Sequence, residues 1–307
     1  MCCSYRPFLI VFLSALSILG CSDSSNKGAI QHVNDKIVAE AEVAATEVLE
    51  RHIVARNNSD AVAIADEDNY HQVRISSGQV EIRETAEETI WIQENITFPF
   101  FAATGWDHSV WDEINIVQSS ENKVHFALIF SRFDALGNKY HTAPTFWAVT
   151  YQDNHWGIKF RSSFTDDSSR NGDVAEAETA AIKVLERHLE ARNDRDTESL
   201  AALNSYPLVF LSDVELNVFE TIDDYILYEE TVVIHDLDYS DWDHSEWEKL
   251  EVIQSTETTV HITGKLSKFD VMGKRYLTQD QFWVITNSDG DWKIQAQSNF
   301  VDAIQRN

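Results

Sequence analysis

Hydrophobic and polar residues follow the same pattern twice along the chain, and each occurrence begins with an amphipathic helix. Apolar residues recur at helical spacing through 41–53 and again through 177–189. A short helical segment follows each run, and the acidic residue before it, Asp60 or Asp196, is suited to cap a helix N-terminus. The pattern therefore predicts two consecutive helices at the start of each occurrence.

Alternation of apolar and polar residues predicts long antiparallel strands in the last third of each occurrence. In the first occurrence the expected strands are 114–119, 124–133, 140–151 and 156–164, with tight turns at 134–138 and 153–154. A shorter strand at 73–76 and a glutamate-rich, partly helical segment at 81–94 precede them. This order of elements predicts an α+β unit whose sheet wraps around the first helix.

The two occurrences are copies of one sequence. Segment 38–164 aligns with segment 174–300 without a gap, so that His52 corresponds to His188 (188 − 52 = 136) and every other pair has the same spacing. A repeat of this length indicates tandem domains rather than a solenoid of short repeats. We predict two domains, 36–165 and 174–302, joined by a short linker at 166–173.

The N-terminal segment resembles the signal of a bacterial lipoprotein. An apolar run at 8–19 follows Arg6, and the sequence Ile-Leu-Gly-Cys then places Cys21 at the lipidation position. We expect residues 1–21 to be the signal and 22–35 to be an irregular polar tether. The lipid on Cys21 would anchor the protein in the cell envelope, in the outer rather than the inner membrane, with its domains facing the periplasm or the exterior. An ordinary cleaved signal peptide is the alternative.

Charge and cysteine content exclude several classes of function. The formal net charge is −27, from 24 basic and 51 acidic residues, which disfavours nucleic acid and anionic lipid surfaces as partners. The only cysteines are Cys2, Cys3 and Cys21, so the processed chain contains no disulfide and no thiolate zinc site. We expect neither a metal nor a cofactor.

Two sequence phrases resemble one known family. Leu-Glu-Arg-His-x-x-Ala-Arg-Asn begins at Leu49 and again at Leu185, and Trp-Gly-Ile-Lys-Phe-Arg-Ser-Ser-Phe occupies 156–164. With the order of elements, they resemble the NTF2-like superfamily, and most closely its uncharacterised SnoaL-like members. The resemblance implies two tandem cone-shaped α+β barrels, each with helices packed on a curved antiparallel sheet around a pocket. It implies no single activity, because such folds include isomerases, dehydratases, hydrolases, cyclases and binding domains.

Strand alternation sorts the side chains of the sheet. The even positions of 124–134 are mostly apolar and should line the core and pocket. The odd positions place His125 and His261 on the outer face, where we expect the two domains to pair within one chain; a ligand role is the alternative. Gln118 and Gln254 are buried amides that either bridge structural elements or contact a ligand.

Four further residues are candidates for the pocket: two aspartates at its mouth and two tyrosines on a strand that enters it. Asp134 and Asp270 end an inward-facing strand and are either turn residues or general bases. Tyr70 and Tyr206 begin a strand that enters the pocket and either offer a hydroxyl to a ligand or pack.

The first helix carries polar residues on its apolar stripe. His52 and His188 are either hydrogen-bonded core groups or catalytic groups. Arg56 and Arg192 lie one turn later on the same side and could meet a carboxylate on the sheet.

The densest block that both copies retain is Trp-Asp-His-Ser. It supplies Trp106 and His108 in the first copy and Trp242 and His244 in the second. Tryptophans beside an Asp-His pair offer stacking area and a group for proton transfer. The alternative is an aromatic-anchored start of a strand.

These residues favour a non-catalytic, lipid-anchored binding module with an apolar pocket in each domain for a small apolar or aromatic molecule. The second hypothesis is a cofactor-independent isomerase, dehydratase or hydrolase with Asp or His as general base. The third is a structural or assembly lipoprotein. Whether the protein is an enzyme stays open at this point.

Overall fold

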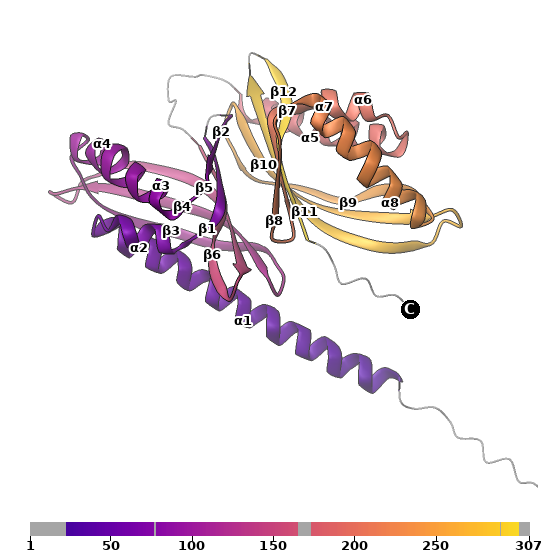
Figure 1. Ribbon diagram of the computed structural model, residues 1–307, viewed down its shortest axis with the longest axis horizontal. Helices are drawn as coiled ribbons and strands as arrows, with labels where there is room; N and C mark the ends of the chain where they lie inside the picture. Colours follow the sequence, from indigo (N-terminus) through magenta and orange to yellow (C-terminus); the bar gives the residue numbers. More distant parts are fainter. Residues whose placement is uncertain (1–22, 77, 165–172, 289, 301–307) are drawn as a thin grey trace, which may run out of the picture.

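The protein consists of two tandem α+β units, each built on one six-stranded sheet (Figure 1). The computed structural model describes residues 23–76, 78–164, 173–288 and 290–300. The predicted signal 1–21, including Cys21, lies outside the described residues, and so does the predicted linker except for its last residue. Within the described part of the chain, no helix is both long and apolar enough to cross a membrane.

The helices of the first unit (domain 1) are α1 (Asp23–Asn57), α2 (Ala61–Asp66), α3 (Ala86–Ile92), the π-helical turn η1 (Gln93–Thr97) and α4 (Phe98–Ala103). Its strands are β1 (Asp68–Ser76), β2 (Gln79–Arg83), β3 (Trp106–Ser119), β4 (Lys123–Asp134), β5 (Lys139–Gln152) and β6 (His155–Ser163).

The second unit (domain 2) repeats this order. Its helices are α5 (Val174–Asn193), α6 (Thr197–Ala202), α7 (Ile222–Tyr228), the π-helical turn η2 (Glu229–Val233) and α8 (Ile234–Tyr239). Its strands are β7 (Asn204–Ser212), β8 (Glu215–Phe219), β9 (Trp242–Ser255), β10 (Thr259–Asp270), β11 (Arg275–Ser288) and β12 (Asp291–Asn299).

Each sheet is open and mixed, whereas the expectation was a barrel with an antiparallel sheet. The strand order is β2-β1-β6-β5-β4-β3 in domain 1, and β8-β7-β12-β11-β10-β9 in domain 2. The pairs β1–β6 and β7–β12 are parallel, and the other neighbours are antiparallel. The helical segment after β2 carries the chain to the opposite edge, so the later meander ends beside β1. The predicted α+β class and the two tandem units are confirmed.

The helical spacing read from the sequence reflects the buried stripe of α1. Its residues Ala41, Ala45, Val48 and Leu49 are buried against Val124, Phe126 and Leu128 of β4. These are even positions of β4, so the predicted concave face is the one that packs on the helix. The predicted irregular tether 22–35 is helical from Asp23 onward, because extending a formed helix fixes few additional residues for each hydrogen bond gained.

The short second helices begin as predicted. The Asp60 side chain accepts a hydrogen bond from the Ala63 amide at 3.0 Å, and Asp196 accepts one from the Ser199 amide at 3.0 Å. Each acidic residue thus satisfies one of the unpaired N–H groups at a helix N-terminus.

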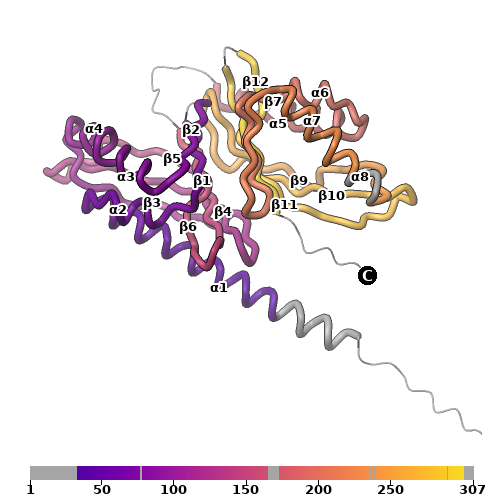
Figure 2. The backbone as a smooth tube through the Cα atoms, viewed as in Figure 1, coloured from indigo at the N-terminus to yellow at the C-terminus, as the bar shows by residue number. Residues whose placement is uncertain are grey.

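The outer faces of the two sheets pack against each other, and the units lie side by side (Figure 2). Phe146 of β5 stacks on Phe282 of β11, with ring centroids 3.4 Å apart and planes at 3°. A shared core of buried residues surrounds them: Val73, Ile75, Ala148, Phe160, Val209, Leu211, Val284 and Ala296. The hydrophobic outer faces therefore form one interior rather than two surfaces.

Two histidines bridge this interface in a symmetric way. His125 Nε2 lies 2.9 Å from Ser298 Oγ, and His261 Nε2 lies 2.8 Å from Ser162 Oγ, so each ring reaches the other domain. Both imidazoles are fully buried. Burial lowers the pKa of His261 to about 3 and that of His125 well below its usual value.

The interface histidines should make the protein less stable in mild acid. The pKa of His261 is about 3 in the folded protein and returns to about 6.5 on unfolding, so below pH ~6.5 the unfolded chain binds more protons. The stabilisation is complete above pH ~6.5 and is lost as the pH falls towards 3. Urea denaturation across this range measures the free energy of unfolding.

His261→Gln is the test variant, because the amide keeps hydrogen-bonding capacity without titrating. We expect it to reduce the pH slope of the unfolding free energy by about one proton. Arg187→Gln, at an exposed arginine that does not titrate in this pH range, should keep the wild-type slope. An unchanged slope in His261→Gln would show that this histidine is not responsible.

Candidate functional site

Domain 1 contains a cavity with a volume of about 630 Å³, larger than the one at the corresponding place in domain 2. It lies between α1, α4 and the concave face of the sheet, and this volume suits a small organic ligand. Its aromatic and apolar lining includes Phe100, Phe101, Trp111, Phe130, Tyr140, Trp147 and Phe164. Its basic lining consists of His52, Arg56, Arg74, Arg132, His141 and Arg161. The cavity is therefore aromatic and cationic at once.

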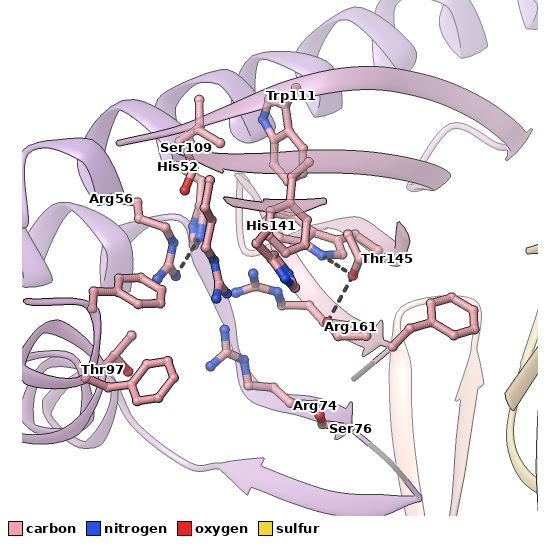
Figure 3. A pocket seen from close by; sticks show the side chains of 18 of the residues that line it. His52, Arg56, Arg74, Ser76, Thr97, Ser109, Trp111, His141, Thr145 and Arg161 are labelled. Atoms are coloured by element: carbon pink, nitrogen blue, oxygen red, sulfur yellow. Dashed lines mark hydrogen bonds between the residues drawn. The ribbon is translucent and has the colours of Figure 1, made fainter. Parts of the chain in front are cut away.

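The basic side chains come from five different elements and converge (Figure 3). The guanidinium groups of Arg56, Arg74 and Arg161 point into the same space beside the His52 ring. Arg74 on β1 stands directly opposite Arg161 on the parallel strand β6. Like charges at opposite positions of a strand pair repel each other. The parallel pairing of β1 and β6 thus brings two positive charges together, and their repulsion destabilises the fold.

Aromatic rings hold two of the guanidinium groups in place. The Arg161 guanidinium lies 3.7 Å from the centroid of the Trp147 ring. Arg132 lies 4.7 Å from the Phe101 centroid and 5.3 Å from the Phe130 centroid. Cation–π contacts of this kind fix the plane of a guanidinium without using its N–H donors.

Carboxylates compensate this charge only in part. Glu81 lines the cavity, but it forms its ion pair with Arg83, at 3.0 Å from Nε to Oε1. Asp68 is buried, and burial raises the pKa of its carboxyl group despite the nearby arginines. Among the described residues, no carboxylate forms an ion pair with Arg56, Arg74 or Arg161. The pocket thus holds more positive charge than the protein neutralises.

The pKa shifts have the same cause. Burial, and then repulsion from Arg74, lowers the pKa of Arg56 to about 9. Burial, and then repulsion from Arg83, lowers the pKa of Arg74 to about 10. Burial and the neighbouring arginines lower the pKa of Arg161 and of His52 well below their usual values. The guanidinium groups of Arg56 and Arg74 remain charged at neutral pH, and an anion would relieve their repulsion.

Unsatisfied polar atoms lie in the same region. Among the described residues, Arg161 Nη1 and His52 Nδ1 are buried without a hydrogen-bond partner. Arg56 Nη2 lies 3.3 Å from His52 Nε2, which makes this imidazole nitrogen an acceptor for the guanidinium. A buried donor without a partner is costly, so Arg161 Nη1 points to a missing acceptor.

Domain 2 has lost most of this arrangement. It has uncharged residues where domain 1 has three arginines: Phe210 for Arg74, Phe219 for Arg83 and Gln297 for Arg161. Phe210, Phe219 and Tyr225 instead form an aromatic cluster, with centroids 5.4 to 6.0 Å apart. The corresponding cavity has a volume of only about 140 Å³. The two copies share a scaffold but not a pocket.

Of the residues singled out from the sequence, His52 and Arg56 line the larger cavity, and His188, Arg192 and Trp242 line the smaller one. The tyrosines, the glutamines, the turn aspartates and the other residues of the Trp-Asp-His-Ser blocks named as candidates lie outside both cavities. The tyrosines hold the short helices: Tyr70 donates to the Ala65 carbonyl at 3.2 Å, and Tyr206 to the Ala201 carbonyl at 3.0 Å. Both hydroxyl groups are therefore engaged in structural hydrogen bonds.

The Trp-Asp-His-Ser blocks begin strands β3 and β9. Trp106 Nε1 donates to Ser109 Oγ at 2.9 Å, and Trp242 makes the same bond to Ser245 at 3.0 Å. A bulge between Trp106 and His108 interrupts the alternation of the strand. The block anchors the strand through its indole.

The Asp-His pairs do form, but on the outside of the fold. His108 Nδ1 lies 2.8 Å from Asp107 Oδ2, and the pair of His244 with Asp243 has the same distance. His108 is 39% exposed and stacks on Phe133, away from the cavity of domain 1.

The two glutamines bridge the domains. Gln118 Nε2 donates to the Gln281 carbonyl at 2.9 Å, and Gln254 Nε2 donates to the Leu128 carbonyl at 3.0 Å. Their Oε1 atoms face the Nδ1 atoms of His125 and His261. Of the two interpretations drawn from the sequence, these contacts fit the structural bridge.

The aspartates form turns. Asp134 Oδ1 accepts hydrogen bonds from the amides of Leu136 and Asn138, and Asp270 Oδ1 does the same in its own turn. Gly137 has a φ of +82°, which the turn requires and glycine allows. Hydrogen bonds from Asn138 lower the pKa of Asp134, which makes it a weak base.

Arg74 of β1 and Arg161 of β6 are not among the residues that the two copies share, so a comparison of the copies does not single them out. Most retained residues stabilise the scaffold at turns, strand starts, helix contacts and the domain interface, whereas His52 and Arg56 line the cavity. The positions that indicate the site are those where domain 1 has arginine and domain 2 does not. Of this cluster, the alternation in 124–134 puts Arg132 on the pocket face, and helical spacing puts Arg56 on the side of α1 that faces the sheet. Within the described residues, no cluster of His, Cys, Asp and Glu suits a metal ion.

Comparison with known proteins gives structural neighbours only. No protein family model matches the chain, and no curated protein matches it. An NTF2-like protein with a cystatin-like fold from Novosphingobium aromaticivorans is similar at 13% identity, with a TM-score of 0.37, over 48% of this chain and 94% of that chain. An NTF2-like protein of unknown function from Pseudomonas putida is similar at 14% identity and a TM-score of 0.36, over 44% and 93%.

A third neighbour is a ketosteroid isomerase-like protein from Erwinia carotovora atroseptica. It has 14% identity and a TM-score of 0.32, and the match covers 43% of this chain and 97% of that chain. Each match thus covers less than half of the present chain. No activity follows from these neighbours, so function must be argued from the site.

Proposed function

We propose that the protein is a ligand-binding module whose domain 1 binds a small anionic molecule. One observation carries this proposal: Arg56, Arg74 and Arg161 converge in one cavity without a carboxylate partner among the described residues. Guanidinium groups are suited to planar oxyanions, which they bind through paired N–H donors. The aromatic lining then surrounds the apolar part of the ligand.

This proposal differs from the apolar pocket expected in each domain. The cavity of domain 1 is cationic as well as aromatic, and that of domain 2 is about 140 Å³ against about 630 Å³. Domain 2 serves instead as a folded partner that covers the outer face of the domain 1 sheet. A purely structural role for both domains does not account for an open cavity in which, among the described residues, Arg56, Arg74 and Arg161 have no carboxylate ion-pair partner.

An enzymatic role has less support from the site. An isomerase or hydrolase without a cofactor needs a base near the substrate. His52 is the titratable base on α1 at the cavity, but burial and Arg161 hold its pKa far below neutrality. A base with so low a pKa abstracts protons poorly at neutral pH. Binding without chemistry is therefore the function we propose.

Isothermal titration calorimetry with charged and neutral probes of one shape tests the proposal. We expect naphthoate or naphthalene sulfonate to bind, and the neutral naphthamide to bind at least about tenfold more weakly. Arg161→Gln, which copies domain 2, should weaken anion binding by about tenfold or more. Arg187→Gln, at an exposed arginine of domain 2, is the matched control and should leave binding unchanged.

Equal binding of naphthoate and naphthamide would refute anion recognition. Binding that is the same in Arg161→Gln and the wild type would show that the anion lies elsewhere.

We further propose that a lipid on Cys21 tethers this module to the cell envelope. The support is the sequence alone: the apolar run at 8–19 followed by Ile-Leu-Gly-Cys. Mass spectrometry of the mature N-terminal peptide, from protein made in a bacterial host, would detect diacylglycerol on that cysteine. A mature N-terminus elsewhere, without lipid, would refute the anchor.

A further inference from the structure

In domain 2, the carboxylate of Glu229 forms an ion pair with Arg192. Arg192 of α5 binds Glu229 of η2 through both nitrogens of its fork, with Nη2 to Oε1 at 2.8 Å and a second hydrogen bond from Nη1 to Oε2. The Glu229 side chain is completely buried, and both residues line the small cavity. Burial lowers the pKa of Arg192, but the Glu229 carboxylate outweighs this effect and raises it.

Domain 1 has the arginine without the carboxylate. Arg56 corresponds to Arg192, and Gln93 of η1 corresponds to Glu229 (229 − 93 = 136). Gln93 is fully buried, and among the described residues neither its Oε1 nor its Nε2 has a hydrogen-bond partner. The same scaffold thus holds a satisfied ion pair in one copy and unsatisfied groups in the other.

This difference identifies the chemistry of the missing group. We propose that the ligand of domain 1 carries a carboxylate that binds Arg56 as Glu229 binds Arg192. The inference rests on the proposed anion-binding function and names the class of anion. Glu229 shows that a carboxylate fits the fork of an arginine in this position of the fold.

The other residues that line the cavity indicate the chemistry of the rest of the ligand. Phe101 and Trp111 line the cavity together with Arg56, whereas Arg74 and Arg161 approach from the sheet. A flat aromatic body would contact the rings and leave a second oxygen substituent for the sheet arginines. The ligand class is therefore a small aromatic carboxylic acid.

Gln93→Glu installs in domain 1 the carboxylate that domain 2 already has. We expect this variant to bind naphthoate about 30-fold or more weakly than the wild type, because its own carboxylate occupies Arg56. The ligand-free variant should also unfold at a higher temperature. Gln93→Leu is the matched control: it removes the same amide without adding a charge, and it should retain naphthoate binding within about threefold.

Two comparisons separate this inference from the proposed function. If naphthoate binds no more tightly than naphthalene sulfonate, the carboxylate assignment is wrong while anion binding stands. If neither probe binds, the proposed function itself is wrong. Naphthoate binding to Gln93→Glu at wild-type strength would also overturn the assignment.

Arg56→Lys gives the same test if Gln93→Glu does not fold. Lysine keeps the positive charge but lacks the paired N–H donors of the guanidinium, so naphthoate binding should weaken by about tenfold or more. Undiminished binding would exclude a bidentate carboxylate at this residue.

Discussion

Arg74→Phe should stabilise the ligand-free protein by about 1–3 kcal/mol and abolish anion binding. Arg74 faces Arg161 across the parallel pair β1–β6, and Arg83 also repels it. Domain 2 has Phe210 at this position, so the fold accepts the ring. The gain in stability comes from removing a partly buried charge that the nearby carboxylates compensate only in part. The loss of binding comes from removing one of the guanidinium groups that would hold the anion.

Urea denaturation without ligand measures the first effect, and calorimetry with naphthoate measures the second. Arg187→Gln also removes one positive charge, but from an exposed site, and should change the unfolding free energy by less than about 0.5 kcal/mol. If Arg74→Phe is less stable than the wild type and still binds naphthoate, then repulsion between the arginines neither destabilises the ligand-free protein nor favours anion binding.

Glu229→Gln should destabilise domain 2 by about 3–5 kcal/mol. Glu229 is completely buried and neutralises Arg192 through both oxygens. Without the carboxylate, the Arg192 guanidinium remains charged in a cavity of only about 140 Å³. Domain 1 tolerates an equivalent glutamine because its cavity, at about 630 Å³, leaves room for water around Arg56.

The neighbouring Glu230 offers a matched control for this loss. Glu230 is exposed, so Glu230→Gln should alter stability by less than about 0.5 kcal/mol. Urea denaturation of both variants gives the comparison. Equal stability of the two variants would mean that the Arg192–Glu229 pair contributes nothing beyond a surface charge.

Much of the fold could be predicted because its signals are local. Apolar spacing in 41–53 identified the buried stripe of α1, and alternation in 124–133 identified which face of β4 packs on it. Asp60 and Asp196 cap helices through bonds to residues three positions away. The parallel pairing of β1 with β6 was not predicted, because it joins segments far apart in the chain.

The candidate site could be predicted only in part for the same reason. Strand alternation predicts that Arg132 faces the pocket, and helical spacing predicts that Arg56 faces the sheet. Arg74 and Arg161 carried no local sign of a site, since each is one polar residue in an alternating strand. Their meaning appears when β1 and β6 come together and place the two charges opposite each other.

The sequence by itself determined that this protein has two copies of one α+β unit, and which residues each copy buries, because periodicity along a helix or strand is a property of neighbouring residues. Only the tertiary structure decided that the copies differ in their cavities. It brings five arginines (Arg56, Arg74, Arg83, Arg132 and Arg161) from different elements close enough to repel each other in domain 1. In domain 2 it pairs the single retained arginine of that set, Arg192, with an internal carboxylate. Electrostatic energy depends on distance through space and on burial. Neither quantity can be read from the order of residues along the chain.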